Sequence, residues 1–137
     1  MAGKINIVGA GYALDALTGR ATVTARTIYL ALLTAAATVS TTLASMTEYA
    51  VAGYARQTIA MSTPSGTPRV SSNTALLTFG PLTGATGSTA ITYFAGVSAS
   101  SGTTGDVVFQ GDWTASRTPN AGDSLTVAIG AVTVQLD

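Results

Sequence analysis

The chain has 137 residues, contains neither cysteine nor histidine, and balances six basic against six acidic side chains to a net charge of zero. These counts exclude disulfides, thiolate zinc sites and thiol nucleophiles, and they remove the commonest general base and metal ligand. Because the charged residues are scattered, they favour neither nucleic-acid binding, nor a metal site, nor paired-carboxylate catalysis. We therefore predict one non-enzymatic domain without cofactor, metal or nucleic-acid partner.

Charged residues make up only 9% of the chain, against about 25% in an average soluble domain. Proteins with a net charge near zero tend to associate, because their surfaces repel one another little. The composition therefore suits a subunit of an ordered assembly. A soluble β-domain with a threonine-rich exterior is the alternative.

The stretch KINIVGAGYAL at residues 4–14 has the strand and the glycines that open a dinucleotide-binding domain. Such a site also needs Gly or Ala at the third glycine position and an acid about 20 residues further on. Leu14 occupies that position, and no acid lies between residues 15 and 48. We predict instead a glycine-rich turn followed by a short helix over residues 12–17, which ends near Gly19.

The pattern divides the chain into an N-terminal arm with this helix, residues 1–26, and a β-sandwich domain, residues 27–137. The glycines give the arm freedom to turn. We expect neighbouring subunits, more than the rest of the same chain, to order residues 1–11.

From residue 27 onward, β-branched and aromatic runs alternate with turn residues. The segment 35–46 is ambiguous and is consistent with a loop that contains a helical turn. The run 28–39 is too short to span a membrane. Several short strands at this spacing predict a mainly β fold, an antiparallel β-sandwich that is jelly-roll-like or a small barrel. The expected strands cover residues 27–33, 53–61, 72–79, 89–99 and 106–113.

The C-terminal segment SLTVAIGAVTVQL alternates apolar residues, and the parity changes across Gly130-Ala131. If these two residues form the loop of a hairpin, Ile129 faces Val132 and the apolar side chains share one face. Glycine at the first loop position suits a type II′ turn. One continuous strand with a bulge at Gly130 would also restore the parity.

Four segments, TIYLALLTA, VAGYARQ, SNTALLTF and AGDSLTVAIG, follow one another along the chain. In order and spacing they resemble a family of small virion proteins of tailed bacteriophages, usually labelled tail fibre, minor tail or minor structural protein. The resemblance runs from about residue 12 to the end, and the segment AAATVSTTLASM replaces an acidic, proline-bearing loop. The matching positions are Tyr29, Leu30, Leu32, Thr34, Val51, Gly53, Tyr54, Ala55, Arg56, Gln57, Asn73, Phe79, Ala121, Gly122, Asp123, Leu125 and Gly130.

The resemblance implies a non-enzymatic virion structural protein, made in the host cytoplasm and located in the virion. The first expectation is a capsid decoration or minor capsid protein that stabilises the assembled particle. The alternative is a minor tail or tail-tip protein of the same fold, and a second alternative is a receptor- or carbohydrate-binding module. The expected partners are other virion subunits, either the major capsid protein or tail proteins, and further copies of the chain in a homo-oligomer or lattice.

Three side chains are candidates for assembly contacts. The resemblance places Tyr54 and Arg56 on one face of a strand, where Arg56 would bind carbonyls or a carboxylate of a neighbouring subunit. Equally, the pair could cover the edge of its own core, because arginine stems often lie along apolar surface. Trp113 is either a platform for a sugar or an anchor in the core or in an interface.

Overall fold

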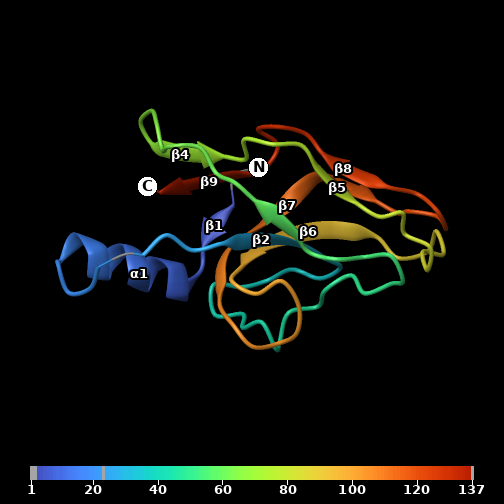
Figure 1. Ribbon diagram of the computed structural model, residues 1–137, viewed down its shortest axis with the longest axis horizontal. Helices are drawn as coiled ribbons and strands as arrows, with labels where there is room; N and C mark the ends of the chain where they lie inside the picture. The colour runs from blue at the N-terminus through green and yellow to red at the C-terminus, as the bar shows by residue number, and fades with distance from the viewer. Residues whose placement is uncertain (1–2, 23, 137) are drawn as a thin grey trace.

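The computed structural model describes residues 3–22 and 24–136, and Figure 1 shows how their strands and helix follow one another. Within these residues the fold is mainly β, with antiparallel sheets and one N-terminal helix, which confirms the predicted fold class. The described strands form three separate sheets rather than a closed barrel. The elements are β1 (Lys4–Ile5), α1 (Ile7–Leu17), β2 (Ile28–Leu33), β3 (Gln57–Ile59), β4 (Arg69–Ser72), β5 (Leu77–Phe79), β6 (Ile91–Val97), β7 (Val107–Arg117), β8 (Leu125–Val127) and β9 (Thr133–Leu136).

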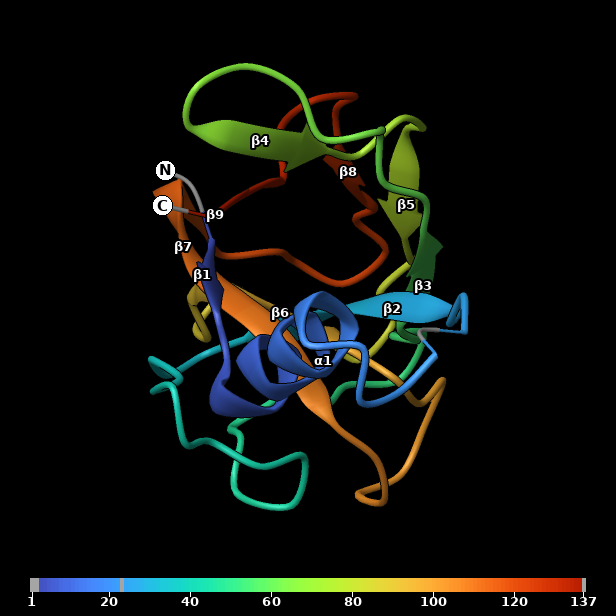
Figure 2. The same cartoon turned by 90° about the vertical axis from the view of Figure 1, so that its left-hand side faces the viewer.

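The sheets are arranged in two layers. One layer is a five-stranded antiparallel sheet in the order β1-β7-β6-β2-β3, and the other consists of two antiparallel ribbons, β4–β9 and β5–β8. Isolated bridges join the layers, since Met61 pairs with Asn73 and Gly3 pairs with Val134. Figure 2 shows the ribbons across the core from the sheet, with α1 at the end nearest the viewer.

Strand β2 buries side chains on both faces of the five-stranded sheet. Leu30 and Leu32 lie in the core between the layers, whereas Ala31 lies on the opposite face. The segment 35–46, ambiguous in the sequence, is a loop with turns, and its Leu43 packs against that opposite face. Because both faces are covered, the strand has a continuous apolar run instead of an alternating one.

The predicted C-terminal hairpin is wrong, because β8 pairs with β5 and β9 pairs with β4. Between them the chain makes a turn in which the Ala131 N–H donates to the Ala128 carbonyl at 3.1 Å and Gly130 has a φ of 77°. Ile129 is 66% exposed, whereas Val132, its expected partner, is fully buried. The continuous-strand alternative fails as well, since the two halves belong to different ribbons.

Asn73 accounts for this separation of the two ribbons. Its side-chain oxygen accepts a hydrogen bond from the Val132 N–H at 2.9 Å, and its side-chain nitrogen donates to the carbonyls of Ala75 and Ala128, each at 2.9 Å. The residue is only 1% exposed. The amide thus holds the corner at which both chain segments change direction, and it divides the expected strand 72–79 into β4 and β5.

The other predicted strands are present, with different ends. Strands β2 and β6 lie within the ranges expected from their apolar and aromatic residues. Strand β3 is shorter than the expected 53–61, because residues 53 and 52 form a turn and residues 54–56 precede the ladder. Strand β7 continues four residues beyond the expected end at 113.

The N-terminal segment differs most from the prediction, because β1 pairs with β7 and α1 begins at Ile7 instead of residue 12. Asn6 caps the helix, since its side-chain oxygen accepts from the Val8 N–H at 3.1 Å and its nitrogen donates to the Thr41 carbonyl at 3.1 Å. The expected glycine-rich turn is therefore helical. The helix end is confirmed, with Gly19 at a φ of 68° just beyond it.

Contacts within the chain hold α1 against the sheet, although neighbouring subunits were expected to order this stretch. Gly9 is buried against β7, and a Cβ at this position would stand 2.5 Å from the Val108 carbonyl oxygen. The Tyr12 hydroxyl donates to Asp106, and the Arg26 guanidinium lies 3.9 Å from the centre of the Tyr12 ring. Across the described residues, no helix combines the length and the apolar character needed to cross a membrane.

The two helical glycines provide a matched test of this docking. We expect Gly9→Ala to lower the free energy of unfolding by about 1–3 kcal/mol, because the added methyl overpacks the contact with Val108. Gly11→Ala should raise it by about 0.5–1 kcal/mol, because alanine stabilises a helix interior and a Cβ there meets no atom within 4 Å. Urea denaturation measures both changes. Equal effects of the two substitutions would contradict the described position of α1.

The corner amide provides a second test. Asn73→Ala should lower the free energy of unfolding by several kcal/mol, because each buried donor or acceptor left without a partner costs about 1–3 kcal/mol. Asn120→Ala, at an exposed asparagine, is the control and should change the free energy by less than about 0.5 kcal/mol. Urea denaturation again gives both values, and a stable Asn73→Ala variant would show that the corner does not depend on the amide.

Candidate functional site

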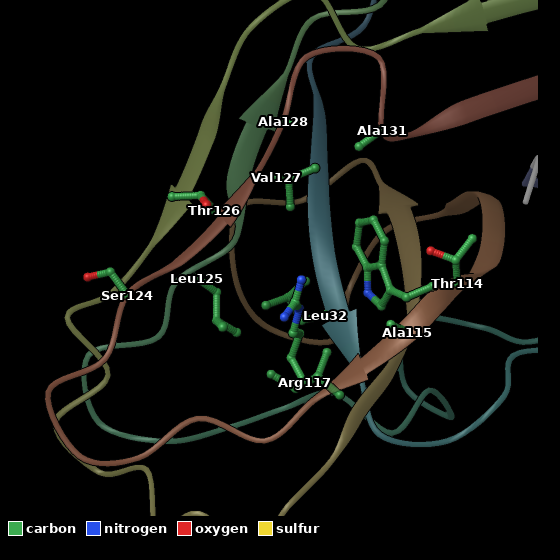
Figure 3. A pocket seen from close by; sticks show the side chains of 12 residues that line it. Leu32, Thr114, Ala115, Arg117, Ser124, Leu125, Thr126, Val127, Ala128 and Ala131 are labelled. Atoms are coloured by element: carbon green, nitrogen blue, oxygen red, sulfur yellow. The ribbon is translucent and has the colours of Figure 1, made fainter.

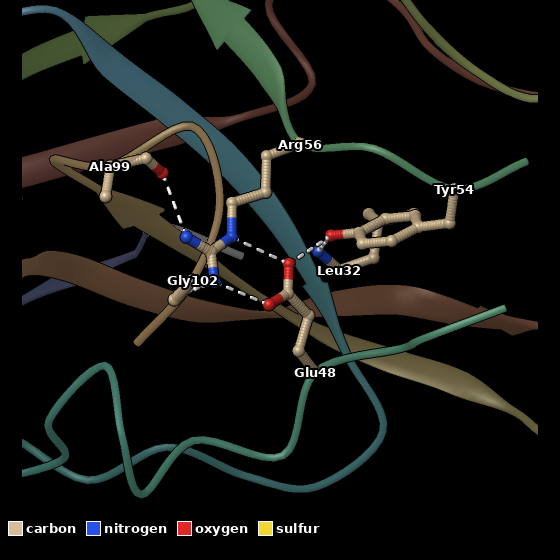
Figure 4. Close-up of polar contacts among 6 residues, drawn as sticks. All are labelled: Leu32, Glu48, Tyr54, Arg56, Ala99 and Gly102. Carbon is tan, nitrogen blue, oxygen red and sulfur yellow. Dashed lines mark hydrogen bonds and ion pairs between the residues drawn. The ribbon is translucent and has the colours of Figure 1, made fainter. Parts of the chain in front are cut away.

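Two of the three candidate residues converge on one carboxylate, as Figure 4 shows. The Tyr54 hydroxyl donates to Glu48 Oε1 at 2.7 Å, and Arg56 binds both oxygens of Glu48, through Nε at 2.8 Å and Nη2 at 2.6 Å. Tyr54 and Arg56 lie just before β3 rather than within a strand, and both side chains point to the same side. Such a two-point contact between a guanidinium and a carboxylate fixes geometry as well as charge.

Arg56 also holds a loop of its own chain. Its Nη1 donates to the Ala99 carbonyl and its Nη2 to the Gly102 carbonyl, each at 2.9 Å. The Arg56 side chain is only 5% exposed and that of Glu48 is 20% exposed. The carbonyls and the carboxylate that Arg56 was expected to find on a neighbour are thus present within the same chain, and a part in assembly contacts stays a prediction.

Tyr54 connects this cluster to the core. Its hydroxyl accepts a hydrogen bond from the Leu32 N–H at 3.0 Å, and its ring is parallel to that of Phe79, with centroids 6.0 Å apart. Burial raises the pKa of the Tyr54 hydroxyl well above its usual value, and the negative charge of Glu48 raises it further. The hydrogen bond to Glu48 raises the pKa of Arg56, against the opposing effect of burial. Tyr54 therefore stays neutral and Arg56 stays charged at neutral pH.

The sequence interpretation missed Glu48, the residue on which the other two converge. The available signal is its isolation, because it is the only acid between Asp15 and Asp106. In a chain with so few charges, an acid inside an apolar and hydroxyl-rich stretch indicates a specific partner, since an unpaired buried charge is costly.

Trp113, the third candidate, lies away from this cluster, at a cavity between β7 and β8 of about 460 Å³. Its ring packs on Phe94, with centroids 4.5 Å apart and planes tilted by 46°. Leu32 and Ile91, both buried, also line the cavity. Figure 3 shows how β8 and the turn after it face β7 across this space. The remaining lining residues are Thr114, Ala115, Arg117, Ser124, Leu125, Thr126, Val127, Ala128 and Ala131.

Arg117 supplies the charge in this cavity, and the sequence interpretation did not single it out. Trp113, Ala115 and Arg117 are alternate residues of β7 and therefore share one face of the sheet. Figure 3 shows the Arg117 guanidinium within the space between β7 and β8. Among the arginines that the structure describes, Arg117 is the one whose side chain has neither an ion pair nor a hydrogen bond to the protein.

A double-mutant cycle tests the buried cluster against an exposed pair. Arg56→Ala and Glu48→Gln, alone and together, should give a coupling energy of about 1.5–3 kcal/mol, because charged hydrogen bonds shielded from water are strong. Asp15 and Arg20, whose side chains are 37% and 80% exposed, serve as the control and should couple by less than about 1 kcal/mol.

Chemical denaturation gives these energies. Hydrogen exchange should also become faster in residues 99–105 of Arg56→Ala, because the carbonyls of Ala99 and Gly102 lose their donor. Equal coupling energies in the two pairs, with unchanged exchange, would show that the cluster does not hold the loop.

The family model described as Podophage GP4 fiber I protein gp80 matches residues 9–135. No curated protein matches the chain.

Proposed function

The chain belongs to the podophage GP4 fiber I protein (gp80) family, and from this premise we propose that it is a non-enzymatic structural subunit of a tail fibre. It is a phage fibre protein and thus part of the virion, as the sequence resemblance implied. The observation that carries the proposal is the extent of the match, which begins within α1 at residue 9 and continues through the β-sandwich to residue 135.

From the sequence, capsid decoration was the first expectation and a location in the tail was the alternative. The family description names a fibre, and nothing in the match supports a place on the capsid shell. We therefore propose that the partners are other tail proteins and further copies of the same chain. The division into residues 1–26 and 27–137 is kept as part of this proposal, with α1 at one end of the long axis (Figure 1).

The arrangement of the charged side chains supports a structural role. The partly buried charges Arg56 and Glu48 are bound to one another, and Arg56 also binds the backbone, so they hold a loop rather than face a substrate. The third expectation, carbohydrate binding at Trp113, finds little support in the cavity. The Ser124 hydroxyl points away from the space between the strands (Figure 3), although sugar hydroxyls need such partners.

Antibody labelling of intact virions tests the proposal. An antibody raised against the purified chain should label tail fibres in electron micrographs of the phage. An antibody against the major capsid protein serves as the control for labelling of the shell. Label spread over the capsid faces would contradict the tail location, and unlabelled virions that lack the chain by mass spectrometry would contradict the role as a virion subunit.

A further inference from the structure

The outer face of α1 is apolar and has no cover within the chain. Leu14 and Leu17, three residues apart and hence neighbours on the helix surface, are 62% and 80% exposed. Leu17 is the most exposed large hydrophobic side chain among the described residues. Asp15 lies in the same last turn, and its partner is the exposed Arg20 at 3.2 Å. This end of the helix thus presents two leucines and a carboxylate to solvent.

The cavity between β7 and β8 is complementary to this end of the helix: it is a concave apolar space that carries a positive charge. Its walls are largely apolar, with Leu125 and Val127 of β8 opposite Trp113 and Ala115 of β7. Its volume of about 460 Å³ lies within the range of about 300–1,000 Å³ that binding cavities occupy. The unpaired Arg117 guanidinium supplies a positive charge. Tryptophan and arginine are the residues most enriched at the centres of protein interfaces.

We propose that the last turn of α1 from one copy of this chain docks into the cavity of the next copy. Leu14 and Leu17 fill the apolar space, and the Asp15 carboxylate pairs with the Arg117 guanidinium. Asp15 gives up an exposed ion pair, and such pairs contribute little to stability. In return it gains a partner in a partly desolvated cavity, where a charged hydrogen bond is stronger.

The positions of the two surfaces determine the shape of the assembly. Figure 1 shows α1 at one end of the long axis and the β5–β8 ribbon toward the other end. Because the two surfaces differ, each contact leaves one free helix and one free cavity for the next copies. A contact of this kind is heterologous and produces an open line of subunits unless its rotation closes a ring. This inference rests on the proposed role in a fibre and adds the interface that would extend it.

Two variants that each lose one surface test the contact by sedimentation velocity. Leu17→Arg disrupts the docking surface of α1 and leaves the cavity intact. Arg117→Glu makes the cavity repel Asp15 and leaves the docking surface of α1 intact. The wild type should form oligomers that grow with protein concentration, and each variant alone should need at least a tenfold higher concentration to associate. An equal mixture should form a heterodimer that does not grow, because only one productive contact remains.

Matched substitutions control for surface changes in general. Leu76→Arg alters another exposed leucine, 58% exposed, and Arg69→Glu reverses the charge of another exposed arginine. Both should associate like the wild type. Asp15→Arg combined with Arg117→Asp should restore oligomers, because the charge pair is exchanged rather than removed.

Disulfide trapping gives a second measurement, which does not depend on the effect of charge on folding. The chain contains no cysteine, so a mixture of Leu17→Cys and Ala115→Cys chains can form a mixed disulfide only between copies. Oxidation should trap this heterodimer, whereas Leu76→Cys mixed with Ala115→Cys should not form it.

Three results would overturn the proposal. A wild type that stays monomeric up to millimolar concentration excludes the contact. If Arg117→Glu associates normally while Leu17→Arg does not, the helices pair with one another. Absence of the mixed disulfide excludes the predicted proximity. Each result leaves the tail-fibre proposal intact if antibodies still label the fibres, so the two failures can be distinguished.

Discussion

The corner at Asn73 is the constraint on which the two-layer arrangement depends. One buried amide satisfies two carbonyls and one N–H at the point where the second layer bends. Because buried polar backbone groups need partners, this amide allows the chain to turn inside the protein. The bend directs β4–β9 and β5–β8 to different parts of the core, and together the two short ribbons cover the five-stranded sheet.

Local patterns in the sequence were sufficient to predict an element where its structure depends only on which residues are buried or form turns. The apolar run of β2, the aromatic strand β6 and the glycine after α1 were predicted from their residues. The alternation in this C-terminal segment indicates that Leu125, Val127 and Val134 pack against the core, but it does not identify the partner strands. That choice depends on Asn73, more than 50 residues earlier in the chain. Likewise, Gly9 was interpreted as a turn residue, whereas its role is the close contact of α1 with the Val108 carbonyl.

In the candidate site, too, the sequence revealed some residues but not the distant partners on which they depend. Tyr54 and Arg56 were found through the family resemblance of the segment that contains them, and Trp113 was found through its aromatic side chain. The partner of the first two, Glu48, lies in a loop without periodicity, so nothing local indicated the contact. Arg117 was missed because its significance is the lack of a partner, which only the three-dimensional arrangement reveals. Among the charges that do pair within the chain, Arg56 with Glu48 holds a loop in place.

The short strands at the two edges of the five-stranded sheet affect how readily unassembled chains aggregate. The five-stranded sheet ends on β1, with two residues, and on β3, with three. Bridges from Gly3 to Val134 and from Met61 to Asn73 continue past these edges into the second layer. Long free edges recruit strands from other molecules indiscriminately, and short, partly covered edges suppress this. Edges of this kind protect chains that have not yet assembled from amyloid-like aggregation.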